Sequence, residues 1–219
     1  DSAVFHTQVE SWARVIGYNQ CGIGFCSFRV YMKNGLIKDY ATAVKATGKT
    51  SIRTWMLNKV TDQNGNYMTI NYMVDSINSN AYPQTITYTL NQGINQYRYV
   101  QFGYEPRPDS ISTYQGGAVV PYTKPLNIIQ TYVGHQLAMT YSISYQQGVS
   151  TGKSQVATVT QCAGDGGCLS PTTVYWQGQD SSLYNSPVAS TQNIPNTGIN
   201  LPMDVNGDGL IDYVHAWQG

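Results

Sequence analysis

Oxygen-bearing side chains alternate near the C-terminal end of the sequence, at Asp204, Asn206, Asp208 and Asp212. Leu210 would add its backbone carbonyl to this set, and a glycine follows Asp208 where a calcium loop turns sharply. Carboxylates held this close together repel one another unless a cation neutralises them, and Ca²⁺ prefers a shell of such oxygen ligands. We therefore predict a Ca²⁺ site formed by Asp204, Asn206, Asp208, Leu210 and Asp212.

The residues around this loop disfavour a helical calcium motif. Pro202 stands where an entering helix should run, and His215 takes the place of the closing glutamate of an EF-hand. Residues 213–217 have the pattern of a strand, so we expect the loop to join two strands. A turn without metal stays open as an alternative, because Asn-Gly and Asp-Gly favour turns by themselves. Mg²⁺ is the lesser metal candidate, and the all-oxygen ligand set disfavours zinc.

Two further groups of residues have types that suit catalysis. Gly148–Gly152 matches the Gly-x-Ser-x-Gly pattern of a hydrolase, with Ser150 as nucleophile, but that motif requires a parallel strand before it and a helix after it. Here it separates two alternating segments, 137–146 and 154–161, which favours a hairpin loop. Glu105 and Asp109 flank Arg107, and a surface ion pair is a simpler interpretation of them than a glycosidase pair.

The histidines and tyrosines give weaker indications. His6, His135 and His215 share no metal-ligand spacing, and we expect His135 to be exposed in a turn after Gly134. Aromatic side chains on strands either pack across the sheet or form a sugar-binding face. The tyrosines considered for such a face are Tyr97, Tyr99, Tyr114 and Tyr122. We predict no enzymatic activity, and a calcium-dependent adhesin or carbohydrate-binding module is the alternative function.

The four cysteines form two close pairs, Cys21 with Cys26 and Cys162 with Cys168. Each pair brackets a loop that contains glycine, and such a loop can bring two Cα atoms to disulfide distance. Local disulfides are therefore expected. A shared zinc site would need unusually wide spacing within each pair, and free thiols would require a reducing compartment.

Two-residue periodicity dominates the chain. Apolar or aromatic side chains alternate with small or polar ones over 137–146, over 85–90 and over 100–104. Glycine- and asparagine-rich turns separate these segments, which predicts an all-β fold, either an antiparallel β-sandwich or a hairpin sheet. Asp39–Thr47 is the single candidate for a short helix, although its Thr and Val content disfavours one.

Composition excludes several classes of partner. Twelve basic and twelve acidic residues give a formal net charge of +0, and no basic cluster indicates nucleic-acid binding. No apolar run approaches the roughly 18 residues of a membrane span. The sequence begins with Asp1 and shows no signal peptide, so we expect a processed piece of a longer protein. The abundance of Tyr, Gly, Ser, Thr and Asn suits an extracellular β protein.

Three regions are expected along the chain. Residues 1–176 are expected to form an all-β domain, and residues 177–200 are expected to be a polar linker rich in Ser, Asn, Gln, Pro and Gly. Residues 201–219 contain the calcium loop.

Several segments resemble one bacterial family. The most specific is Thr54–Asn66, which combines a tryptophan strand, an aspartate and a Gly-Asn hairpin; Tyr82–Tyr88, Val100–Asp109 and Ser154–Trp176 follow in order. Together they resemble the virulence-plasmid B protein family, which includes the B subunits of insecticidal toxin complexes and is related to RHS/YD-repeat proteins. In that family an FG-GAP or VCBS-type β-propeller follows, and Asp204–Asp212 resembles the loop of its blades.

The resemblance implies a secreted structural module and implies no catalytic activity for this segment. It implies an RHS-like hairpin sheet that ends in a truncated propeller-blade segment, as part of a shell that presents or encloses a toxin. The implied partners are other toxin-complex subunits or the remainder of a longer chain. A glycan or host surface would be the partner under the alternative function as an adhesin or carbohydrate-binding module.

Overall fold

The structure is a computed structural model that describes residues 2–93, 97–149, 151–176, 199–203 and 212–216. The chain divides into two units, Asp1–Gln177 and Gly178–Gly219, and each is considered by itself. No helix among the described residues is long and apolar enough to cross a membrane.

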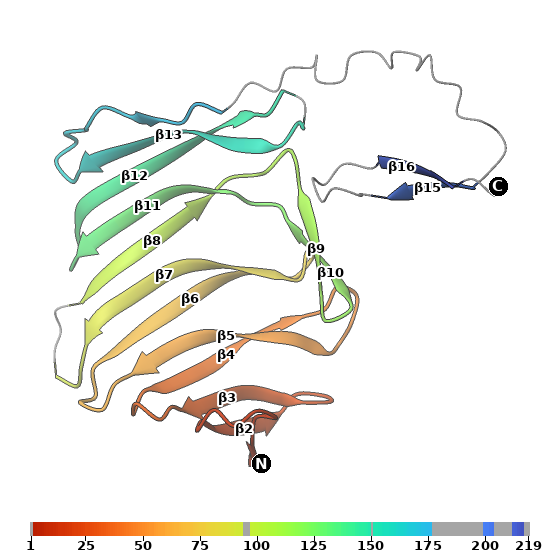
Figure 1. The fold of residues 1–219 in the computed structure, drawn as a ribbon. Coiled ribbons are helices and arrows are strands. Elements are labelled where there is room, and N and C mark those ends of the chain that lie inside the picture. Colours follow the sequence, from red (N-terminus) through yellow and green to blue (C-terminus); the bar gives the residue numbers. More distant parts are fainter. Residues whose placement is uncertain (1, 94–96, 150, 177–198, 204–211, 217–219) are drawn as a thin grey trace. The chain divides into compact units, whose positions relative to one another are not determined.

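Twelve antiparallel strands of the first unit form one sheet (Figure 1). Apart from one excursion between β8 and β11, each strand pairs with the next along the chain, as a succession of hairpins requires. The strands are β1 Ser2–Phe5, β2 Arg14–Gln20, β3 Phe25–Tyr31, β4 Ile37–Lys45, β5 Ile52–Thr61, β6 Tyr67–Asp75, β7 Asn80–Leu90, β8 Arg98–Tyr104, β11 Leu126–Val133, β12 Gln136–Gln147, β13 Ser154–Ala163 and β14 Thr172–Thr173.

The excursion is a separate two-stranded hairpin, β9 (Ile111–Gln115) and β10 (Ala118–Tyr122). Its two-residue turn consists of Gly116 and Gly117 with φ values of 56° and 75°, a conformation that glycine adopts without strain. Figure 1 shows this hairpin running across the strands of the main sheet. In the second unit, β15 (Ile199–Met203) pairs with β16 (Asp212–Ala216).

The expected all-β class is confirmed, and within the described residues the architecture is the hairpin sheet rather than the sandwich. The candidate helix at Asp39–Thr47 is wrong, because most of that segment lies in β4. Its alternating β-branched and aromatic residues pair with β3 on one side and β5 on the other.

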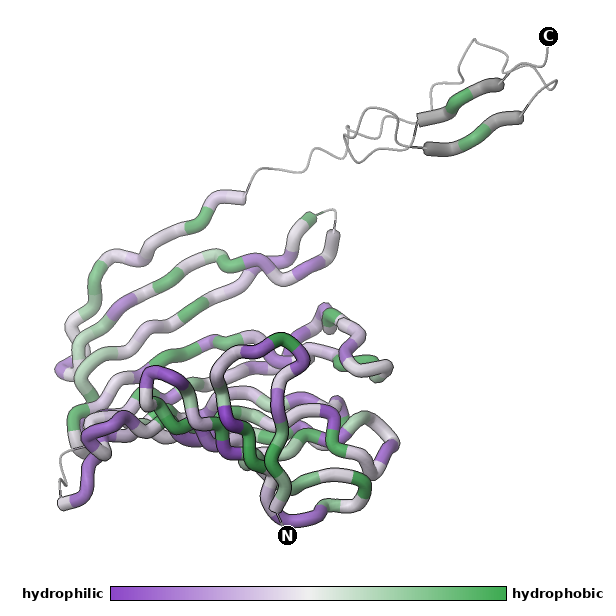
Figure 2. The backbone as a smooth tube through the Cα atoms, turned by 60° about the horizontal axis from the view of Figure 1, so that its bottom comes forward, coloured by the Kyte–Doolittle hydropathy of each residue, from purple (hydrophilic) through white to green (hydrophobic). Residues whose placement is uncertain are grey.

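Among the described residues of the first unit, nothing covers either face of the main sheet along its whole length. Ile70, Ile86 and Val100 lie in one cross-strand row, and Thr69, Thr87 and Tyr99 lie in the adjacent row on the opposite face. Figure 2 shows the resulting alternation of apolar and polar residues along the strands. Every residue of β5 is half-buried, as are nearly all residues of β13, which is the pattern of a single-layer sheet.

The most deeply buried side chains come from a few strands of the first unit. Among the described residues, the buried hydrophobic side chains are Val44, Ile70, Tyr82 and Val120, and the buried polar ones are Ser79 and Asn80. Three of these six lie at the start of β7 or just before it, beside β10. The small core is therefore associated with the docked β9–β10 hairpin.

An aromatic chain packs the N-terminal strands. Phe5, Phe25, Phe28 and Trp55 meet edge to face, and the indole Nε1 of Trp55 donates to the carbonyl of Phe25 at 3.0 Å. Gly17 makes this packing possible, since a Cβ there would lie 2.6 Å from the Phe25 ring. Trp55, the conspicuous residue of the Thr54–Asn66 motif, thus links β5 to β3, and the aromatic cluster as a whole joins β1, β3 and β5.

Both cysteine pairs are disulfides, Cys21–Cys26 and Cys162–Cys168, so they form no shared zinc site. The second disulfide holds the turn after β13. Without the segment that follows this turn, the outer edge of β13 would have no backbone hydrogen-bond partners. Backbone bonds from Leu169 to Gln161 (2.9 Å) and from Val174 to Ala157 (2.9 Å) cover that edge. Covering an edge in this way prevents uncontrolled strand pairing.

Candidate functional site

The predicted calcium loop lies almost wholly outside the described residues. Asp204, Asn206, Asp208 and Leu210 are not among them, while Asp212 is the first residue of β16 and pairs in register with Met203. The structure therefore confirms that the loop joins two antiparallel strands, as expected from the sequence. The Ca²⁺ ligands themselves stay a prediction.

Ser150 also lies outside the described residues, but its surroundings are described. Gly148 donates to Lys153 at 2.8 Å and Gly152 donates to Gly148 at 2.8 Å, so 148–153 is a tight connection between β12 and β13. These strands are antiparallel neighbours, whereas a hydrolase nucleophile follows a parallel strand and begins a helix. The expected hairpin loop is confirmed.

The Glu105–Asp109 segment contains a structural latch, by which we mean a buried carboxylate, Asp109, whose hydrogen bonds tie this segment to the start of β13. Asp109 accepts bonds from the backbone N–H of Ser154 (2.7 Å), from the Ser154 hydroxyl and from the Arg107 guanidinium (3.1 Å). These bonds hold the pKa of Asp109 well below its usual range, first through the Ser154 hydroxyl and then through its N–H and Arg107. A carboxylate held ionised and occupied in this way is unsuited to be a general acid.

The expected arginine–carboxylate pair therefore exists, but it is not on the surface. The Arg107 side chain is 16% exposed and that of Asp109 is 7% exposed. The pair joins the loop after β8 to the first residue of β13, which fixes the path of the chain into the β9–β10 hairpin. The pair therefore positions the segment between β8 and β9 against the start of β13.

The tyrosines considered for sugar binding separate into two groups. Tyr97 and Tyr99 stack on one another, and Tyr99 stacks on Tyr132 with ring centroids 4.4 Å apart. His135 is exposed, as expected, and closes the row with a 2.9 Å hydrogen bond between its Nε2 and the Tyr97 hydroxyl. Since these rings turn their faces toward one another, cross-strand packing describes them better than a sugar platform. Tyr114 and Tyr122 lie on the β9–β10 hairpin instead.

The β9–β10 hairpin is fastened to the main sheet through polar groups. The Tyr82 hydroxyl accepts from the backbone N–H of Thr123 at 3.2 Å, and the side-chain amide of Asn80 donates to the carbonyl of Pro121 at 3.4 Å. Burial and the neighbouring Tyr82 raise the pKa of Tyr104, which packs on Tyr82, to about 12. Arg53 bridges the same region, with one guanidinium nitrogen donating to the carbonyl of Ser79 at 2.6 Å and another to the side chain of Gln115.

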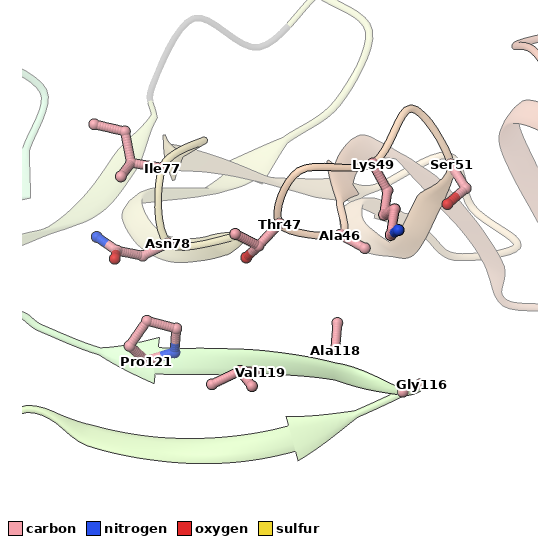
Figure 3. A pocket seen from close by; sticks show the side chains of 11 residues that line it. Ala46, Thr47, Lys49, Ser51, Ile77, Asn78, Gly116, Ala118, Val119 and Pro121 are labelled. Atoms are coloured by element: carbon pink, nitrogen blue, oxygen red, sulfur yellow. The ribbon is translucent and has the colours of Figure 1, made fainter.

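A cleft of about 590 Å³ lies between β10 and two turns of the main sheet. One wall is formed by Gly116–Val119 and Pro121, and the others by residues of the β4–β5 and β6–β7 turns. Figure 3 shows Ala118, Val119 and Pro121 on one side, facing Thr47, Lys49 and Asn78 on the other. A volume of this order is typical of small-molecule or peptide sites.

Sequence reasoning missed this cleft because its walls are distant in the chain. Thr47 and Ser79 are joined by a 2.7 Å hydroxyl contact across thirty-two residues, and nothing in either turn indicates that contact. The Gly116–Gly117 turn and Pro121 were the available signals, since a proline in a strand indicates a free edge.

Comparisons with known proteins show what this fold resembles. No protein-family model matches the sequence, and no curated protein matches it. The N-terminal domain of effector protein SpvB from Salmonella typhimurium strain LT2 is similar in structure, with a TM-score of 0.59 and 11% identity over 74% of this chain and 69% of that one.

Two larger structures are also similar. The Photorhabdus luminescens Tc holotoxin pore matches with a TM-score of 0.69 and 14% identity, covering 100% of this chain and 13% of that chain. The TcdB2-TccC3-TEV crystal structure matches with a TM-score of 0.66 and 13% identity, over 97% of this chain and 13% of that one. The chain thus spans about an eighth of the length of these two matches. At such identities the likeness is one of fold: this chain has the fold found in an SpvB N-terminal domain and in Tc toxin components.

Proposed function

We propose that this chain is a non-enzymatic structural module of a secreted bacterial toxin-complex or virulence protein, and that it forms part of a shell that presents or encloses a toxin. The observation that carries the proposal is the continuous antiparallel sheet of twelve strands with few fully buried side chains. A sheet of this kind suits a wall, since its half-buried faces are available to other parts of a larger assembly.

Three further observations support the proposal, and they concern the absence of a catalytic arrangement in these clusters, the partners and the environment. The two clusters with catalytic residue types are accounted for by local structure, since Asp109 is a latch and the Gly148–Gly152 motif is a hairpin turn. The solved structures with the same fold include a Tc holotoxin pore and a TcdB2-TccC3 complex, which favours other toxin-complex subunits, or the rest of a longer chain, as partners. The disulfides suit an oxidising, extracellular environment.

Protease protection tests the shell. The full-length protein is assembled with its partner subunit, and a toxic segment carrying an epitope tag is followed during trypsin digestion. We expect the tag to survive in the intact assembly and to be lost when the Asp109→Ala and Tyr82→Ala changes loosen the wall together. Rapid loss of the tag from the intact assembly would contradict enclosure.

We further propose that Ca²⁺ binds at Asp204, Asn206, Asp208, Leu210 and Asp212 and stiffens the β15–β16 connection as the start of a propeller-type blade. The alternating acids and the strands on either side support this. In a protein that includes the whole blade, Ca²⁺ should raise the melting temperature. Asp208→Ala should abolish that rise, while Asp165→Ala, which changes a carboxylate of the first unit, should not. Calorimetry without binding at millimolar Ca²⁺ would refute the site.

A further inference from the structure

The cleft beside β10 contains a stretch of unpaired strand edge. In a hairpin closed by a two-residue turn, the pair that flanks the turn exchanges hydrogen bonds and the next pair does not. Gln115 and Ala118 flank the turn here, so Val119 and Tyr114 form the next pair. The backbone N–H and C=O of Val119 therefore point away from β9, toward the side of β10 that lines the cleft.

The accessible edge is short and has clear ends. Pro121 has no N–H to offer, and its carbonyl is already approached by the Asn80 amide. The Gly116–Gly117 turn closes the other end. Val119 is consequently the residue of β10 at which another extended chain can add with both a donor and an acceptor. Val119 is 44% exposed, and Ile77 across the cleft is 84% exposed, so apolar contacts are available on both walls.

The charge around this edge is positive. Lys49 lines the cleft itself, and Lys45 and Lys124 line the two adjoining depressions. The acidic residue lining these depressions is Asp75, which accepts bonds from Asn78 at 3.1 and 2.9 Å and attracts Lys124, so it offsets one of these three lysine charges and leaves a positive excess. Arg53 lies under the Gly116 end of the hairpin, and within the described residues it has no carboxylate partner and its Nε is buried without a hydrogen bond.

We propose that this cleft binds an extended acidic segment of a partner protein, which adds as a short strand to β10 at Val119 and places a carboxylate against Lys49. Main-chain bonds to a free edge supply affinity, and the side chains on either side of that edge supply selectivity. The cation excess then selects glutamate or aspartate over neutral or basic residues. This inference goes beyond the structural role proposed above and does not depend on it.

Fluorescence anisotropy with synthetic peptides tests the proposal on the whole chain. The probe is a labelled acetyl-Thr-Val-Glu-Val-Glu-Val-Thr-amide, compared with versions that carry Gln or Lys in place of both Glu residues. We expect saturable binding of the Glu peptide, about fivefold weaker binding of the Gln peptide and no binding of the Lys peptide at moderate salt. Equal affinities for the Glu and Lys peptides, or no binding of the Glu peptide, would overturn the proposal.

Two pairs of variants locate the binding to β10. Val119→Pro removes the outward N–H without touching the bonds to β9, and should abolish binding, whereas Val119→Thr keeps the N–H and should bind as the parent does. Lys49→Gln should weaken binding of the Glu peptide about fivefold. Lys153→Gln, in the turn between β12 and β13, should leave that binding unchanged. Circular dichroism establishes that each variant is folded. Unchanged binding by folded Val119→Pro would refute strand addition.

Discussion

The docking of the β9–β10 hairpin can be tested with two adjacent valines. Val120 is 1% exposed and Val119 is 44% exposed, although they are neighbours in one strand. Replacing either valine by alanine removes two methyl-sized groups, and it lowers the intrinsic strand preference by the same amount at both positions. Two buried methylene equivalents contribute about 1.6 kcal/mol, and an uncollapsed cavity raises the cost to about 2–3 kcal/mol. We expect Val120→Ala to cost this much and Val119→Ala to cost less than about 1 kcal/mol.

Urea unfolding followed by tryptophan fluorescence measures both costs under one set of conditions. The informative quantity is the difference between the two variants, which we expect to be about 1.5 kcal/mol, because strand preference cancels in it. A shift of one residue in the hairpin register would exchange the buried and exposed faces. Equal costs, or a larger cost for Val119→Ala, would therefore refute the packing described for this hairpin.

Three other perturbations have defined outcomes. The folded state lowers the pKa of Asp109, so this carboxylate stabilises the fold above its ordinary pKa of about 4 and the benefit is lost as the pH falls. Asp109→Asn should therefore lower the melting temperature at pH 7 and do so less at pH 3. Asn58→Ala should cost about 2 kcal/mol in urea unfolding, since the Asn58 side chain binds the N–H groups of Ala41 and Thr42 and the carbonyl of Ile70. Replacing Cys162 and Cys168 together by serine should cost about 2 kcal/mol, as expected for a small loop, and reducing agent should then have a smaller effect on the melting temperature than in the parent.

Local patterns were sufficient to predict strands and turns, but they left the choice between a sandwich and a hairpin sheet open. Alternation over 137–146 predicts β12, and the turn residues around Gly65 predict the β5–β6 hairpin, where Asp62 accepts bonds from Asn64 and Asn66 at 2.8 Å each. Local patterns gave the wrong prediction at Asp39–Thr47. A short helix was considered there, but most of the segment is a strand that pairs with a neighbour on both sides. Sheet pairing outweighs single-residue propensity when both neighbours are present.

Contacts between distant segments were not predictable in this way. Asp109 and Ser154 are separated by forty-five positions, and the sequence suggested a surface pair rather than a buried latch. The cleft beside β10 depends on the same kind of information, because three turns far apart in sequence form it. The sequence indicates strands and turns, whereas their juxtaposition depends on how the hairpin crosses the sheet.

Electron cryo-microscopy of the full-length protein in its assembled complex tests the structural role most directly. We predict that the twelve-stranded sheet appears as one section of a continuous β wall, with a face turned toward an enclosed or presented segment of another polypeptide. A sheet that stands apart from the assembly, with both faces exposed to solvent, would contradict that role.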